Sequence, residues 1–161
     1  MLKLKNNITM KRFFITLFLS ILILPLYAGK IYNGSYKYSS NVLFTYSDGK
    51  LYKGNYTYIN NVLYTYDNGI VYKGNYKYYS HIAMTYHNGQ CYKGNLLYIN
   101  NILWTYYDNK VYKGNSKNLS DCILTIKDGH VYKGNSTYFS DIILTYDNNI
   151  PIPFLVITAM M

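Results

Sequence analysis

Residues 64–75 read YTYDNGIVYKGN, and residues 84–95 read MTYHNGQCYKGN, so nearly the same dozen residues return after twenty positions. In the first stretch, runs rich in Tyr, Val and Thr flank Asn68 and Gly69. An Asn-Gly step between two such runs is the strongest short-range signal for a β-hairpin. The stretch therefore predicts a β-hairpin, and its sequence is repeated along the chain.

The hairpin unit recurs six times without insertion or deletion, over residues 30–49, 50–69, 70–89, 90–109, 110–129 and 130–149. Three positions hold the same residue type in every unit. They are Tyr32, Tyr52, Tyr72, Tyr92, Tyr112 and Tyr132; Gly34, Gly54, Gly74, Gly94, Gly114 and Gly134; and Thr45, Thr65, Thr85, Thr105, Thr125 and Thr145. A fixed short period predicts an architecture in which each unit packs only against its neighbours.

Each unit contains two strand-like runs, exemplified by residues 62–66 of the second unit and 71–78 of the third, which are rich in residues that suit a pleated sheet. A two-residue Asn-Gly turn sets Thr65 opposite Tyr72, so the shared Tyr, Gly and Thr lie on one face. We expect the missing side chain of Gly74 to let a neighbouring ring lie flat on the strand. The prediction is an all-β antiparallel meander of about twelve short strands, as an open twisted single-layer sheet rather than a closed barrel or rosette.

The turn motif also carries a resemblance. The pattern GxxYxG occurs at 49–54, 69–74, 89–94 and 129–134, and YTYDNGIVYKGNY resembles MORN repeats. That resemblance implies an elongated sheet of hairpins that serves as a membrane-adjacent scaffold, a dimerisation platform or a protein-binding surface. The units are shorter than MORN repeats, and no Trp follows Tyr-x-Gly. The chain is also similar to the wall-binding repeats of Gram-positive surface proteins, which cage choline with paired Trp and Tyr, although it has only Trp104.

The N-terminal stretch MKRFFITLFLSILILPLYAGK is typical of a secretory signal peptide, with cleavage after Ala28. The alternative is a retained membrane anchor, but the apolar run of about 14 residues is short of the roughly 20 that span a bilayer. We therefore predict a signal peptide over 1–28, the six repeats over 29–149, and an irregular apolar tail or capping strand over 150–161. The mature chain is expected in the periplasm, at the cell surface or secreted, without a retained transmembrane helix.

Composition restricts the classes of partner. The formal net charge is +9, but four cations precede the first repeat, and from Gly29 onward twelve Lys stand against seven Asp, a net charge of about +5. This mild excess favours anionic surfaces. Nucleic acid is not an expected partner, because a chain with Arg12 as its one arginine lacks the bidentate side chains that read bases.

Catalytic and metal-binding patterns are not found in the sequence. There is no Glu, and the seven Asp all fall in or beside turns, where Asp supports the turn conformation. His81, His87 and His130 occupy three different positions of the repeat, so no ligand set recurs. Cys91 and Cys122 also differ in repeat position, and we expect them to stay unpaired. The prediction is a non-enzymatic protein without a cofactor or a bound metal.

A periodic surface is the remaining candidate for a site. Lysines recur on every second strand, and on the same face we expect Tyr64 and Trp104 beside the row formed by Lys53, Lys73, Lys93, Lys113 and Lys133. We predict that this Lys/Tyr face binds an envelope polymer, anionic lipid or a protein partner. The alternative is a purely structural element that forms a homo-oligomer through its Tyr faces, with the lysines protecting exposed sheet from edge pairing.

Overall fold

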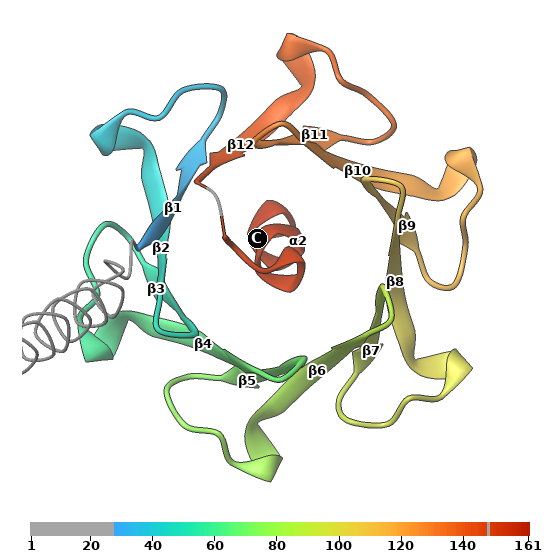
Figure 1. Cartoon of the computed structure of the whole chain (residues 1–161), viewed down its shortest axis with the longest axis horizontal. Coiled ribbons are helices and arrows are strands. Elements are labelled where there is room, and N and C mark those ends of the chain that lie inside the picture. Colours follow the sequence, from blue (N-terminus) through green and yellow to red (C-terminus); the bar gives the residue numbers. More distant parts are fainter. Residues whose placement is uncertain (1–27, 148) are drawn as a thin grey trace, which may run out of the picture.

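The structure is a computed structural model that describes residues 28–147 and 149–161, so nearly all of the predicted signal peptide lies outside the described residues. Within them, twelve antiparallel strands form one closed barrel in which each strand pairs with its neighbours in sequence (Figure 1). The strands are β1 (Gly29–Asn33), β2 (Val42–Ser47), β3 (Lys50–Lys53), β4 (Val62–Asp67), β5 (Ile70–Lys73), β6 (Ile82–His87), β7 (Gln90–Lys93), β8 (Ile102–Tyr107), β9 (Lys110–Lys113), β10 (Cys122–Lys127), β11 (His130–Lys133) and β12 (Ile142–Tyr146). The predicted all-β meander of hairpins is confirmed.

The predicted open sheet is wrong, because the first and last strands pair with each other. Strand β1 pairs with β2 on one side and with β12 on the other, where Tyr32 lies opposite Thr145. The twist between neighbouring strands curls the sheet, and closure leaves no strand edge unpaired. The N-terminal strand thus completes the last hairpin of the chain.

The hairpin turns have the conformation that their sequence requires. At Asn68 φ is +47° and at Gly69 it is +85°, and two positive φ values in succession define the type I′ turn of a tight hairpin. In the fourth unit, Asp108 and Asn109 take the same conformation with φ of +48° and +59°. The predicted register is confirmed, with Thr65 opposite Tyr72 in the β4–β5 pair.

The shared glycine ends a strand instead of continuing it, which corrects the expectation of a strand over 71–78. Strand β5 stops at Lys73, and Gly74 has φ of +73°, a conformation that favours glycine. A Cβ atom at Gly74 would meet no atom within 4 Å, so the backbone conformation, and not a ring packed flat on the strand, requires glycine here. Its N–H donates to the carbonyl of Leu63 at 2.8 Å, and the chain then turns away from the barrel.

The shared threonine holds the chain at the point where it leaves the barrel wall after the shared glycine. In every unit the Thr hydroxyl donates to the carbonyl oxygen of a shared glycine at 2.7–2.8 Å, in the pairs Thr45–Gly54, Thr65–Gly74, Thr85–Gly94, Thr105–Gly114, Thr125–Gly134 and Thr145–Gly34. Five of these pairs lie within ten residues of sequence. The sixth joins the end of the repeat array to its beginning, so the same bond that shapes each hairpin also closes the ring.

Six loops project outward from the barrel wall, as Figure 1 shows. We call them petals: residues 34–41, 54–61, 74–81, 94–101, 114–121 and 134–141. Each petal ends in a single turn of 3₁₀ helix, namely η1 (Ser39–Asn41), η2 (Ile59–Asn61), η3 (Tyr79–His81), η4 (Ile99–Asn101), η5 (Leu119–Asp121) and η6 (Phe139–Asp141). The polar second turn of the repeat is therefore the tip of a petal.

The barrel interior holds the C-terminal segment, which forms the helix α2 (Ile152–Ala159) at the centre of the ring (Figure 1). Its residues 153–158 are all buried, and the helix is apolar on every side, as expected when protein surrounds it completely. The prediction of an irregular tail or a capping strand is wrong, because the closed barrel leaves no edge to cap and offers an apolar interior to fill. Within the described residues, no helix is both long and apolar enough to cross a membrane.

The wall and the helix form one core. At one position of each unit the wall side chain has no exposed surface, and this set is Ile31, Leu51, Val71, Cys91, Val111 and Val131. Phe154 of the helix contacts the rings of Tyr46 and Tyr66 edge-on, with centroids 5.6 and 5.9 Å apart. A helix that touches the wall on all sides is expected to stabilise the closed ring, because it buries the inner face of the hairpins.

Candidate binding surface

Most of the carboxylates take part in turns or in hydrogen bonds within a petal. Asp48, Asp108 and Asp128 occupy hairpin turns with positive φ, and Asp121 and Asp141 accept hydrogen bonds from Ser hydroxyls inside their own petals. Across residues 28–147 and 149–161, no three His, Cys, Asp or Glu side chains come together as a metal site would require. These carboxylates shape turns and petals.

The structure separates the two parts of the predicted Lys/Tyr face. The predicted lysines are all exposed, and each ends the second strand of a hairpin: Lys53, Lys73, Lys93, Lys113 and Lys133. Trp104, in contrast, is only 3% exposed and lies on the inner wall, where its ring is 5.6 Å from that of Tyr86. Tyr64 is partly buried against the same core. The lysines therefore follow the circumference of the ring, while the aromatic residues meant to accompany them belong to the interior.

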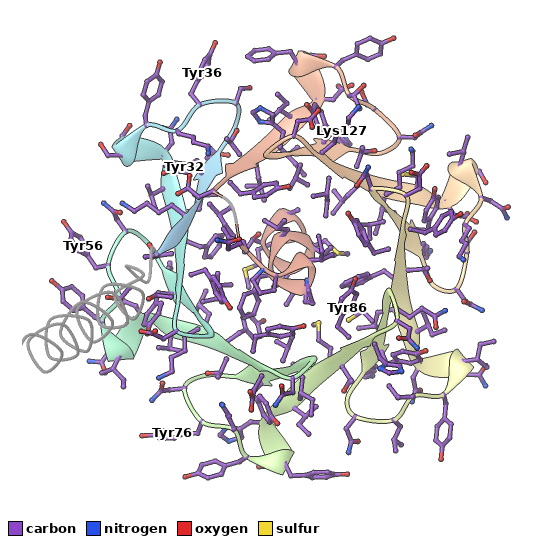
Figure 2. All side chains as sticks on the ribbon, viewed as in Figure 1. Tyr32, Tyr36, Tyr56, Tyr76, Tyr86 and Lys127 are labelled. Atoms are coloured by element: carbon purple, nitrogen blue, oxygen red, sulfur yellow. The ribbon has the colours of Figure 1, made fainter. Side chains whose placement is uncertain are left out.

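The petals carry exposed aromatic residues that the sequence reasoning missed. In the first three petals two tyrosines stack with ring centroids 5.5 Å apart, in the pairs Tyr36–Tyr38, Tyr56–Tyr58 and Tyr76–Tyr78. Each of these rings is between 54% and 65% exposed, and Figure 2 shows the labelled ones pointing away from the barrel. The spacing of two residues, directly after a glycine that ends the strand, is the sequence signal that could have revealed them.

The petal tips are apolar as well. The first residue of the 3₁₀ turn is a large apolar or aromatic side chain in five petals, between 60% and 75% exposed: Ile59, Tyr79, Ile99, Leu119 and Phe139. Soluble proteins rarely leave many such side chains in solvent, and exposed apolar patches mark surfaces of interaction. Stacked rings and apolar tips together make the outer rim of the ring its most unusual surface.

Three petals are tied to the barrel by a lysine. The Nζ atom of Lys77 lies 2.9 Å from a carboxylate oxygen of Asp67. Lys37 occupies the same position in the first petal as Lys77 in the third, and its Nζ atom lies 2.9 Å from a carboxylate oxygen of Asp147. Lys117 instead stands 4.3 Å above the ring centre of Tyr107. These cations are paired within the chain, which leaves the petals themselves close to neutral and aromatic.

A groove of about 400 Å³ lies between the third and fourth petals, a volume within the range of small-molecule sites. Tyr79 and Leu97 line it from the two petals, and Tyr72 belongs to the wall at its base. Asn95 spans it, because its Nδ2 donates to the hydroxyl oxygen of Tyr79 at 2.7 Å. The groove thus combines apolar walls with a small number of positioned polar groups.

Comparison with known families agrees with this geometry. A family model described as 6-fold beta flower protein matches residues 31–157, which include all six petals and most of the central helix. The chain belongs to the 6-fold beta flower family. The resemblance to MORN repeats is not confirmed, because the matching family is a different one and its hairpins close into a ring. Neither the curated proteins nor the solved structures gave a match.

The inner wall of this beta flower protein contains a ring of tyrosines whose ionisation is opposed by burial. Burial, together with the charge of neighbouring phenols and carboxylates, raises the pKa of Tyr46, Tyr106 and Tyr146 above its ordinary value. For Tyr86, which Figure 2 shows on the inner side of the barrel, burial followed by Tyr106, Tyr66 and Cys91 raises the pKa to about 12. Folding therefore keeps these tyrosine side chains neutral to a higher pH than in the unfolded chain.

We expect the flower to lose stability at alkaline pH. A group whose pKa is higher in the folded than in the unfolded chain stabilises the fold fully below its unfolded pKa, and loses that effect as the pH rises through the folded pKa. For Tyr86 this window runs from about 10 to about 12, and for Cys91, whose pKa burial also raises to about 12, it begins near 9. Urea unfolding followed by circular dichroism at increasing pH measures the loss. Tyr86→Phe should make the decline shallower, and an unchanged decline in that variant would contradict the assignment.

Proposed function

We propose that this beta flower protein is a non-enzymatic binding module of the bacterial envelope, exported by its N-terminal signal segment, and that it contacts its partner through the petals. The observation that carries the proposal is the set of aromatic and apolar side chains exposed on the petals and their tips. A barrel that closes around its own helix supports these loops as a rigid scaffold, and binding residues are commonly found on loops held in this way.

The stacked pairs suit recognition because their geometry is already set. Tyr76 and Tyr78 lie with their planes 18° apart, and the pairs in the first two petals differ by 25° and 22°. A Tyr side chain has a large contact area for few rotatable bonds, so little conformational freedom is lost when it binds. Aromatic residues are accordingly enriched in the centres of interfaces.

The repetition of the petal adds a second advantage. The ring holds several similar contacts around a common centre, so one polymer or one particle can engage more than one petal at a time. Once the first petal has bound, the next binds at a high effective concentration, and overall affinity exceeds that of any single contact. An envelope polymer, itself a repeating molecule, is a partner that would exploit this arrangement.

The chain supplies its own conservative substitutions for a test. Ser116 and Ser136 stand where Tyr36, Tyr56 and Tyr76 stand in other units, so replacing these three tyrosines with serine introduces residues that the petal already accommodates. We expect co-sedimentation of the purified protein with isolated bacterial envelopes to fall about tenfold or more in the triple variant, because several contacts are lost together.

The matched control changes the lysines. Asn33 occupies the place of Lys53, Lys73 and Lys93, so the corresponding Lys→Asn triple variant tests the predicted cationic row. If envelopes retain the Lys→Asn triple variant but not the Tyr→Ser triple variant, the petals are supported as the binding surface. Retention that depends on the lysines and fades with added salt would instead favour the cationic row, and no retention of the unaltered protein would refute envelope binding.

Self-association is the second candidate, and the exposed apolar tips favour it, Phe139 and Ile99 being each more than half exposed. Two flowers that met rim to rim would bury these tips against each other. Sedimentation velocity would then show dimers or larger assemblies that persist at high salt and dissociate when Phe139 and Ile99 are replaced by serine. A monomer at all concentrations would exclude this candidate.

A further inference from the structure

We infer that the groove between the third and fourth petals binds a neutral sugar ring, as part of a glycan chain. The inference rests on the proposed function, since it names a ligand for one pair of petals. A pyranose ring has a face of C–H groups and an edge of hydroxyls, so a site for it needs an apolar surface beside polar groups that both donate and accept hydrogen bonds.

The apolar surface comes from both sides of the groove. Tyr79 is the most exposed of the petal tips, and Leu97 is about half exposed on the opposite petal. Ile70 and Ile82 of the barrel wall also line the groove. A sugar ring that entered between the petals would place its C–H face against an aromatic ring and remove these apolar surfaces from water, which is favourable.

The polar groups are positioned by one another. Because the Nδ2 atom of Asn95 donates to the oxygen of Tyr79 at 2.7 Å, the Tyr79 hydroxyl hydrogen is left to point at a ligand, while Asn95 Oδ1 can accept from one. A hydroxyl of a sugar can both accept the first hydrogen bond and donate the second. The pair therefore offers a donor and an acceptor at the rim of an apolar groove.

The charge of the groove favours a neutral ligand. Lys77 lines it, but its Nζ is 2.9 Å from Asp67, so the cation is already compensated. An anionic ligand would have to compete with that carboxylate. The neighbouring petals hold no further cation here, since the fourth petal has Leu97 where the third has Lys77.

The third petal alone has this combination. The residue equivalent to Tyr79 is Ser39, Ile59, Ile99, Leu119 or Phe139 in the other petals, and none of these offers both a ring and a hydroxyl. The repeated backbone thus gives neighbouring petals a similar arrangement, and only the third petal adds an aromatic hydroxyl at this position, that of Tyr79, which can bond a sugar. We expect a single preferred site rather than equal ones.

The test uses three neutral trisaccharides, namely chitotriose, cellotriose and maltotriose, titrated into the ¹⁵N-labelled protein and followed by NMR. We expect at least one to bind with Kd of about 1 mM or below, with shift changes at the amides of residues 77–82 and 95–97. Tyr79→Ile and Asn95→Ser should each weaken binding about tenfold, which corresponds to about 1.4 kcal/mol. Both introduce residues that equivalent positions already hold, Ile59 and Ser35, so the fold is expected to persist. Phe139→Ile alters the equivalent tip of the sixth petal and should leave the affinity unchanged.

The results separate this inference from the proposed function. If none of the trisaccharides shifts these amides, or if Tyr79→Ile leaves the affinity unchanged, the sugar site is wrong. Tyrosine-dependent retention on envelopes would still stand in that case, with another ligand. If a trisaccharide binds as described but envelopes do not retain the protein, the groove is a sugar site and the envelope assignment fails.

Discussion

Replacing Phe154 with alanine is expected to lower the free energy of unfolding by about 3–5 kcal/mol. Phe154 has no exposed surface and lies against the rings of Tyr46 and Tyr66 on the barrel wall. Removing the ring leaves a cavity at the contact between helix and barrel, where neither element can move to fill it. Because small proteins have total stabilities of only about 5–15 kcal/mol, this loss is a large fraction of the total and should clearly lower the urea concentration at the unfolding midpoint. Urea denaturation followed by circular dichroism measures the change.

Phe139→Ala is the matched control, because it makes the same chemical change on a petal tip that is 62% exposed. Surface substitutions usually alter stability by no more than about 0.5 kcal/mol, so the control should unfold at nearly the same urea concentration as the unaltered protein. Equal losses in the two variants would mean that the helix does not fill the barrel in solution.

Replacing Ile31 with alanine is expected to cost about 2–5 kcal/mol, although this residue lies in the first strand of the described chain. Ile31 has no exposed surface, since its side chain belongs to the core inside the barrel and its strand β1 is paired with both β2 and β12. In an open sheet the same residue would sit on a terminal strand with one free edge, and its loss would matter much less. The variant therefore measures ring closure directly.

Ile59→Ala serves as the comparison for that experiment, since Ile59 is an isoleucine on a petal tip with 63% of its surface exposed. We expect a change of no more than about 0.5 kcal/mol there, measured by the same urea titration. Should Ile31→Ala prove as mild as Ile59→Ala, β1 would not be held between its two partners and the ring would be open.

The hairpins could be predicted because their determinants are local. An Asn68-Gly69 step restricts the backbone to one class of turn, and that turn fixes the partner of Thr65 without reference to the rest of the chain. Closure depends instead on the twist summed over all strands, for which no single residue is responsible. The sequence does hold one indication of it: Thr145 has no Tyr-x-Gly after it, and Tyr32 has no shared Thr before it.

The central helix could not be predicted from a helical pattern. Residues 152–159 are apolar except for Thr158, and a helix surrounded by protein has no polar face to reveal a period of 3.6 residues. Pro151 and Pro153 suggested an irregular segment, yet proline is well tolerated at the start of a helix, which is where both lie. The burial of this segment becomes intelligible only once the barrel is known to be closed.

The candidate surface was misplaced for a related reason. Alternation along the strands correctly separates Thr65 from Tyr64, but both faces of the sheet carry tyrosine, so composition does not tell which face is inside. Trp104 and Tyr64 turned out to belong to the inner wall. A strand over 71–78 would include Gly74 and assign the tyrosines after it to the sheet, whereas strand β5 ends at Lys73 and those tyrosines lie in a petal.

A ring filled by one of its own helices also limits how such a gene can change. An open linear array can gain or lose whole repeat units, because a unit added at its end needs to pack against a neighbour on one side only. Here an additional module would widen the circle, because barrel diameter grows with strand number, and a single helix of eight residues would no longer reach every wall. We therefore expect divergence to concentrate in the outward loops, where the six units of this chain already differ at individual side chains.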